Sequence, residues 1–135
     1  MNITVIDGHG GQLGAQIVKE IKARYPAVLL TAIGTNAVAT AAMLKAGSQN
    51  AATGENPVVV ACRNTDVIIG PIGIVIADSL FGEITPKMAI SVAQSKATRI
   101  LIPMNRCGNL VAGVKDLSTS ALIGDVMHKL ESIII

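Results

Sequence analysis

The clearest candidate for chemistry is a glycine-rich segment near the amino end, Gly8-His9-Gly10-Gly11-Gln12-Leu13-Gly14. It follows a buried-type run of β-branched and apolar residues and precedes a stretch with apolar residues at helical spacing. Glycines let a strand reverse sharply and let a phosphate approach the backbone, and the helix start then offers unpaired N–H groups. The segment therefore predicts a phosphate-binding turn, with a tight turn required only for packing as the alternative.

His9 and Asp7 place titratable groups at this turn. A protonated His9 could bind a phosphate and a neutral His9 could carry a proton, whereas an exposed turn histidine is the structural alternative. Asp7 ends the expected strand, and we expect its carboxylate to accept hydrogen bonds from backbone N–H groups of the turn. His9 is thus a weak catalytic candidate, and Asp7 is expected to be structural.

Arg106 and Cys107 are the other weak catalytic candidates, because they follow a run that predicts a strand, Arg99 to Pro103. An arginine there could clamp a carboxylate or phosphate through two hydrogen bonds, or lie in solvent. Cys107 could be a nucleophile if its pKa is lowered, with a small buried thiol as the alternative. Glu83 and Lys87 flank a helix start, and one of them could act as an acid or a base, but charges are common at helix ends for structural reasons.

Gly34-Thr35-Asn36 follows a second apolar run and would lie beside the glycine turn. NAD sites usually place an acidic residue here to hold the ribose hydroxyls, and NADP sites favour an arginine. Thr35 and Asn36 could hydrogen-bond a ribose or a 2′-phosphate, but capping of the following helix is favoured. The choice between NAD and NADP therefore stays open. Gly70 and Pro71 complete the predicted cofactor site, because Gly70 ends a further expected strand and Pro71 begins the long loop expected over residues 71–83.

The elements that must position these residues alternate along the chain. Strands are expected at Asn2–Asp7, Ala27–Ile33, Asn50–Ala52, Asp66–Gly70, Arg99–Pro103 and Leu110–Val114. Helices are expected at Ala15–Tyr25, Ala37–Ala46, Asn56–Arg63, Lys87–Ser95 and from Ser118 to Leu130. Val58 to Cys62 could instead be a strand, but the next strand follows too soon for a parallel pair. This alternation predicts a single α/β domain over residues 1–135, with a doubly wound, mostly parallel Rossmann-like sheet.

Composition narrows the functional classes. Hydrophobic residues make up 50% of the chain and charged residues 15%, which excludes intrinsic disorder. One Tyr, one Phe and no Trp argue against nucleic-acid modules that stack bases on aromatic side chains. A net charge of +2, spread along the chain, is too small to hold DNA or an anionic membrane.

Cysteine usage and hydropathy bear on metals, location and assembly. Cys62 and Cys107 form no C-x-x-C pair and the chain has two histidines, so no metal site is expected. No signal peptide precedes the first apolar run and no run approaches about 20 apolar residues, so we expect a cytoplasmic protein. The high apolar share and the apolar residues 133–135 predict a homo-oligomer, with a two-fold dimer expected.

Residues 1–14 (MNITVIDGHGGQLG) resemble the start of extended and atypical short-chain dehydrogenase/reductases, in which the first strand runs into G-x-x-G-Q-L-G. The resemblance implies that the pyrophosphate of NAD or NADP lies over residues 8–13. The catalytic Tyr-x-x-x-Lys of that family is missing, because Tyr25 is the only tyrosine and Leu29 stands four positions after it. The resemblance therefore implies the cofactor fold without the reductase chemistry.

A second resemblance spans nearly the whole chain. IDGHGGQLG, IGTNAVATAAMLKAG, ATGEN, DVIIGPIGI, GEITPKMA and ILIPMNRC occur in this order and resemble a family of short bacterial proteins of unknown function. It implies no reaction. The residues themselves predict a small nucleotide-binding protein, with NAD or NADP as the expected ligand and oxidoreductase activity left open. A non-enzymatic nucleotide sensor or regulatory subunit, and an enzyme whose phosphorylated substrate fills the turn, are the alternatives.

Overall fold

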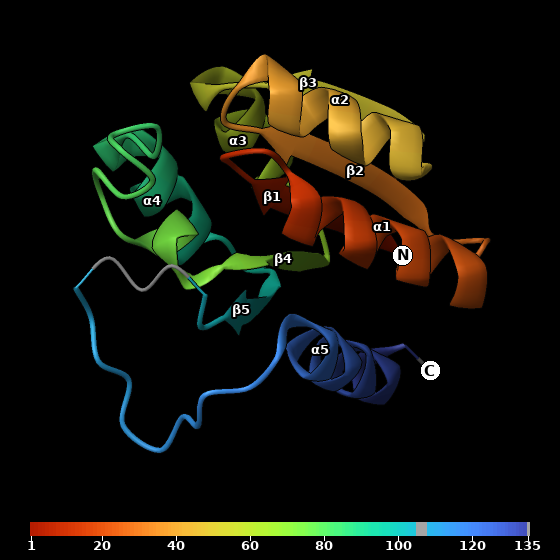
Figure 1. Ribbon diagram of the computed structural model, residues 1–135. Coiled ribbons are helices and arrows are strands. Elements are labelled where there is room, and N and C mark those ends of the chain that lie inside the picture. The colour runs from red at the N-terminus through yellow and green to blue at the C-terminus, as the bar shows by residue number, and fades with distance from the viewer. Residues whose placement is uncertain (105–107, 135) are drawn as a thin grey trace.

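The protein, described here by a computed structural model over residues 1–104 and 108–134, is a three-layer α/β domain. Its sheet has five strands in the order β3-β2-β1-β4-β5 (Figure 1), and every neighbouring pair is parallel. The strands are β1 (Asn2–Asp7), β2 (Leu29–Gly34), β3 (Asn50–Thr53), β4 (Val67–Pro71) and β5 (Thr98–Ile102). This topology confirms the predicted doubly wound, Rossmann-like sheet.

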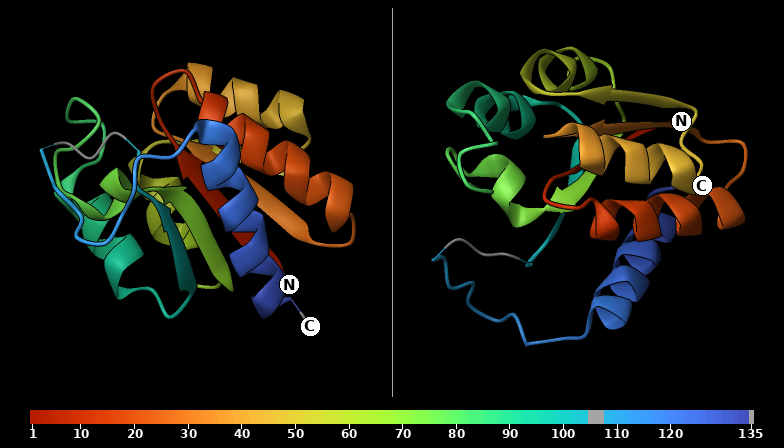
Figure 2. Two further views of the ribbon diagram at one scale, coloured as in Figure 1. Left: turned by 60° about the horizontal axis from the view of Figure 1, so that its bottom comes forward. Right: turned by 45° about the horizontal axis from the view of Figure 1, so that its top comes forward.

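Helices cover both faces of the sheet, as the two views of Figure 2 show. They are α1 (Gln12–Arg24), α2 (Ala37–Ala46), α3 (Glu55–Ala61), α4 (Pro86–Gln94) and α5 (Thr119–Ile133), with a short 3-10 helix η1 (Ile72–Val75) after β4. The first, second and fifth helices lie on one face, and α3 and α4 lie on the other. Right-handed crossovers require this change of face where the strand order reverses, between β1 and β4.

The two faces bury two separate sets of apolar side chains, which explains why the central strands are apolar throughout. In β1, Ile3 and Val5 face α1 and α5, whereas Ile6 faces η1 and α4. All three side chains are at most 1% exposed. The alternation along β1 therefore anchors the glycine turn, which begins at the next residue, to the centre of the domain.

Several expected helix boundaries are confirmed. The side chains of Asn36, Thr85 and Ser118 accept hydrogen bonds from the first turns of α2, α4 and α5. Val58 lies in a helix, as favoured from the sequence. That helix starts earlier than expected, because Gly54 rather than Asn56 is its N-cap.

The predicted strand at Leu110–Val114 is wrong. This segment is irregular, and it follows Gly108, whose φ is +80°. Within it, Gly113 has a φ of +81°, which breaks an extended conformation, and Leu110 is 95% exposed. A strand needs one face against a core, and this segment buries neither of its faces. Figure 1 and the right-hand view of Figure 2 show residues 108–118 running away from the body of the domain.

The segment after β4 also differs from expectation. Pro71 was expected in a loop with residues 72–83, but it is the last residue of β4. Ile72–Val75 then forms a helical turn whose Ile74 is fully buried. Gly70 and Pro71 are therefore buried parts of the sheet rather than an open loop. No described helix is both long and apolar enough to cross a membrane.

Candidate functional site

The glycine turn joins β1 to α1 in four residues, at the carboxyl edge of the sheet. Gly11 is the N-cap of α1 with a left-handed φ of +75°, and its N–H donates to the Gly8 carbonyl at 2.9 Å. His9 is also left-handed, with a φ of +52°. The turn therefore places the first N–H groups of α1 at the end of the central strand, where ligands bind in open α/β sheets.

The Asp7 carboxylate closes this turn from the inside. Its Oδ1 accepts the Gly8 N–H at 2.8 Å and its Oδ2 accepts the Gly14 N–H at 2.7 Å. This confirms the structural role that we expected for Asp7. The side chain belongs to a residue only 5% exposed, and this burial raises the pKa of the carboxyl group, although the two N–H donors and the nearby His9 act in the opposite direction.

Packing requires three glycines here, two in the turn and one in the first turn of α1. A Cβ at Gly8 would lie 2.6 Å from the Thr35 hydroxyl oxygen, and one at Gly11 would lie 2.7 Å from the Ala39 Cα. A Cβ at Gly14 would lie 2.8 Å from the Asp7 Cβ. These distances are shorter than any normal carbon contact, so the strand and the helices approach closely only because side chains are missing.

Gly10 differs from its neighbours. A Cβ added there would meet no described atom within 4 Å, and its φ is outside the left-handed region. The residue is exposed. Neither packing nor backbone conformation among the described residues therefore requires a glycine at this position.

The other predicted cofactor-site glycines are also explained by packing. A Cβ at Gly34 would overlap Thr40, and a Cβ at Gly70 would overlap the Ile6 carbonyl oxygen of the neighbouring strand. Both residues are buried within strands. Their glycine character is therefore a requirement of the sheet and of the start of α2.

Thr35 and Asn36 lie directly beside the glycine turn, as predicted. Asn36 Oδ1 accepts the Ala39 N–H at 2.9 Å, which confirms the capping role favoured from the sequence. Its Nδ2 donates to the His9 carbonyl oxygen at 3.0 Å. Asn36 thus ties the start of α2 to the turn at the start of α1.

A carboxylate that sequence reasoning did not place here reaches the same position. Glu83, from the loop between η1 and α4, accepts a hydrogen bond from the Thr35 hydroxyl at 2.9 Å. It also accepts from Asn36 Nδ2, at 3.1 Å to each oxygen. The end of β2 therefore carries an acidic group that its own sequence lacks.

The predicted catalytic candidates have different outcomes. His9 is exposed, and its ring meets the Phe81 ring edge to face, with 5.7 Å between the ring centroids. Arg106 and Cys107 lie outside the described residues. In residues 1–104 and 108–134, no group of three or more His, Cys, Asp or Glu side chains could hold a metal ion.

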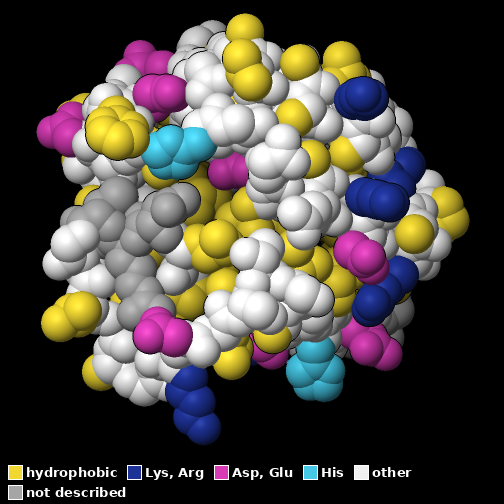
Figure 3. Space-filling view, in the orientation of Figure 1, with side chains coloured by type: hydrophobic (Ala, Val, Ile, Leu, Met, Phe, Trp, Pro, Cys, Tyr) yellow, Lys and Arg dark blue, Asp and Glu magenta, His cyan; other side chains and the backbone are white. Residues whose placement is uncertain are grey.

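Two of the larger surface grooves in the described part of the chain lie away from the turn. One, of about 440 Å³, runs between α1 and α5, where Figure 3 shows hydrophobic side chains in the hollow and charged ones at its right-hand end. The other, of about 480 Å³, lies between α3 and the β2 and β3 strands. None of the residues that line either groove belongs to the glycine turn.

Cys62 is a buried thiol at the end of α3. Burial raises its pKa to about 11, from an ordinary value of 9.0. We expect a thiol-alkylating reagent to modify Cys62 of the folded Cys107→Ser variant about a hundredfold more slowly than an exposed cysteine. The same variant unfolded in urea should react at the ordinary rate. Equal rates in both states would contradict the described burial.

A family model described as a domain of unknown function, DUF3842, matches residues 2–135. The chain belongs to this family. The match confirms the resemblance carried by six segments of the DUF3842 sequence and covers every element of the sheet. Searches of curated proteins and of solved structures returned no significant match to this DUF3842 chain.

Proposed function

We propose that the protein binds a nucleotide, with NAD or NADP as the first candidate, and that the phosphate groups lie on the glycine turn. The strand order supports this proposal, because the order reverses between β1 and β4 and open α/β sheets bind ligands outside such a point. The glycine turn leaves β1 at this point and leads directly into a helix of 13 residues. The partial positive charge at the start of that helix favours an anion.

The observation that carries the proposal is a set of backbone donors. Among the described residues, the N–H groups of Gly10, Gln12 and Leu13 have no hydrogen-bond acceptor, whereas Asp7 takes those of Gly8 and Gly14. Unpaired N–H groups at the start of a helix suit the oxygens of a phosphate. The missing side chain at Gly10 leaves the backbone open to a ligand on this side.

Asp7 makes the site selective rather than generally attractive to anions. A phosphate on the remaining donors would lie near its carboxylate, and like charges repel. An inorganic anion is therefore expected to bind weakly, and a whole nucleotide is expected to bind more tightly because it makes further contacts. Repulsion would raise the pKa of Asp7 further in the complex, so binding is expected to tighten as the pH falls.

The proposal predicts that Gly10→Ala weakens binding and leaves the fold intact. Its Cβ would enter the space of the phosphate, and we expect about a tenfold loss of affinity, or about 1.4 kcal/mol. The measurement is isothermal titration with NAD, NADH, NADP, NADPH, ATP and phosphorylated sugars. Gly124→Ala, on α5, is the matched control because a Cβ there also meets open space.

Melting temperatures check the same prediction independently. A ligand at a hundred times its dissociation constant stabilises the folded state by about 2.7 kcal/mol, so it raises the melting temperature. The control variant should show the wild-type shift and Gly10→Ala a smaller one. The proposal fails if no nucleotide at millimolar concentration shifts the wild-type melting temperature.

A further inference from the structure

Residues 78–84, here called the strap, form a compact loop that lies against the glycine turn. Its ends are closed by a hydrogen bond from the Asp78 N–H to the Ile84 carbonyl at 2.7 Å and by one from the Ile84 N–H to Ser79 at 3.2 Å. Ser79 is buried, and its hydroxyl donates to the Gly73 carbonyl. The strap is thus a built part of the domain, fixed at its base to η1.

The strap meets the turns that follow β1 and β2 at three places. Leu80 is 3% exposed, and a Cβ at Gly8 would lie 2.8 Å from its Cδ1. Phe81 meets the His9 ring, and Glu83 accepts hydrogen bonds from the residues that follow β2. Side chains of the strap therefore surround the edge of the proposed phosphate site.

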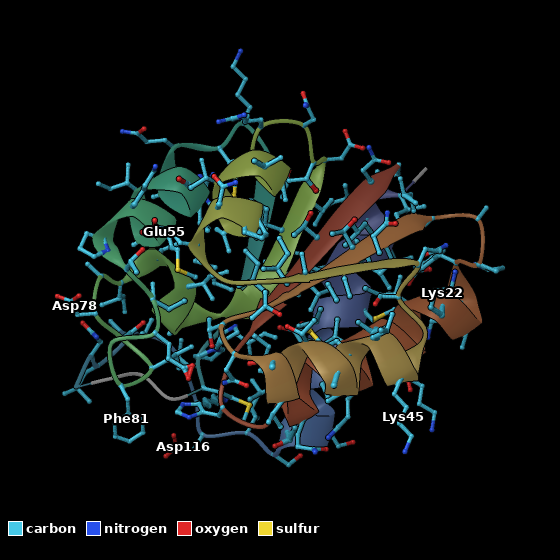
Figure 4. All side chains as sticks on the ribbon, turned by 90° about the horizontal axis from the view of Figure 1, so that it is seen from above. Lys22, Lys45, Glu55, Asp78, Phe81 and Asp116 are labelled. Atoms are coloured by element: carbon cyan, nitrogen blue, oxygen red, sulfur yellow. The ribbon has the colours of Figure 1, made fainter. Side chains whose placement is uncertain are left out.

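Phe81 is unusual in two respects. It is 96% exposed, and Figure 4 shows its side chain directed away from the body of the domain. Its φ is +56°, a conformation that a bulky residue rarely adopts because of the clash between its Cβ and the backbone. Leu80 has the same φ, but its side chain is buried, and this burial offsets the cost of the backbone conformation. Within the described residues, the edge contact with His9 is the only ring contact of the Phe81 side chain.

We propose that the strap holds the nucleoside part of the ligand, with Glu83 binding the ribose hydroxyls and the Phe81 ring stacking on the base. This inference rests on the proposed nucleotide function and names the groups that would recognise the nucleoside. It is carried by the joint placement of an exposed aromatic ring and a carboxylate beside the glycine turn.

Glu83 lies beside the end of β2, where an acidic residue distinguishes NAD from NADP. Carboxylate oxygens accept hydrogen bonds from the 2′- and 3′-hydroxyls of a ribose, but they repel a 2′-phosphate. Thr35 and Asn36 hold the Glu83 carboxylate in place from the end of β2. The strap therefore favours NAD over NADP, although β2 itself ends in neutral residues.

Phe81 supplies a flat aromatic surface in a chain that has one Phe, one Tyr and no Trp. Base stacking on an aromatic side chain contributes about 1–3 kcal/mol per base and accepts any base, because every base has a π-face. A bound base would cover the exposed ring, and His9 at its edge would keep the ring from turning. The exposure of Phe81 in the free chain is then explained by its role in binding.

The test measures dissociation constants of NAD, NADP and inorganic pyrophosphate for the wild type and two variants. We expect the wild type to bind NAD about tenfold more tightly than NADP, and Glu83→Gln to narrow this ratio to about threefold or less. Phe81→Ala should weaken both nucleotides about tenfold and leave pyrophosphate unchanged. Phe81→Tyr keeps an aromatic ring and should keep wild-type affinity.

Matched controls separate ligand contacts from general effects. Ile90→Ala removes a 53% exposed apolar side chain from α4, and Glu131→Gln neutralises an exposed carboxylate on α5. Both should bind like the wild type, and circular dichroism should show that every variant is folded. If the wild type binds nucleotides while Phe81→Ala and Glu83→Gln match it, this inference is overturned and the proposed function stands. If the wild type binds no nucleotide, both are overturned.

Discussion

Gly11→Ala is expected to lower the free energy of unfolding by about 2–4 kcal/mol. The left-handed φ of +75° disfavours any residue with a Cβ. The new atom would also lie 2.7 Å from the Ala39 Cα and 2.8 Å from its carbonyl oxygen, and backbone of this kind cannot move aside as a flexible side chain can. Urea denaturation followed by circular dichroism measures the loss.

Gly10→Ala, one position earlier, is the control for Gly11→Ala. The same methyl group there meets open space, so we expect a change within about 0.5 kcal/mol. We expect the two variants to differ in stability because α2 approaches the backbone closely at Gly11 but not at Gly10. Equal stability of the two variants would contradict that packing.

Asp7→Asn is expected to destabilise the fold by about 2 kcal/mol near neutral pH. The carboxylate accepts from both Gly8 and Gly14, whereas an amide has one oxygen, so one buried N–H loses its acceptor. The relief of a buried charge offsets part of this loss. Because Gly14 lies in the first turn of α1, fraying of this helix end should accompany the change.

The pH dependence of Asp7→Asn provides a second measurement. The folded chain holds the Asp7 proton more tightly than the unfolded chain, because burial raises the folded pKa above the ordinary value of 3.8. The wild type therefore gains stability as the pH falls through the folded pKa, and this gain is complete below the unfolded value. The variant lacks this titration, so its deficit should grow toward acid pH. Parallel stability curves would contradict the raised pKa.

The sheet could be predicted from the sequence because its signals are local. Buried strands on both faces require continuous apolar runs, and β1 and β4 have them. Thr85 and Ser118 precede their helices by one residue, so the helix starts are visible in the sequence. Asp7 was placed correctly because a carboxylate at a strand end has N–H groups close to it in sequence.

The surroundings of the turn could not be predicted in the same way. Glu83 reaches Asn36 across 47 positions, and no local pattern links the two loops. The glycines after β1 indicated a ligand, yet three of them are explained by Thr35, Ala39 and Asp7. Only the topology brings these side chains together. A lone phenylalanine beside a glycine, in an otherwise aromatic-poor chain, was the one available signal for the strap.

The central position of β1 has a consequence for how the domain forms. Ile3 pairs with Leu30 on one side, but on the other side it pairs with Val67, far later in the chain. Contacts of such long range slow folding, because the loop between them must close before they stabilise anything. During synthesis one edge of β1 stays without its neighbour until β4 emerges from the ribosome. Variants that delay this step should aggregate before they lose native stability.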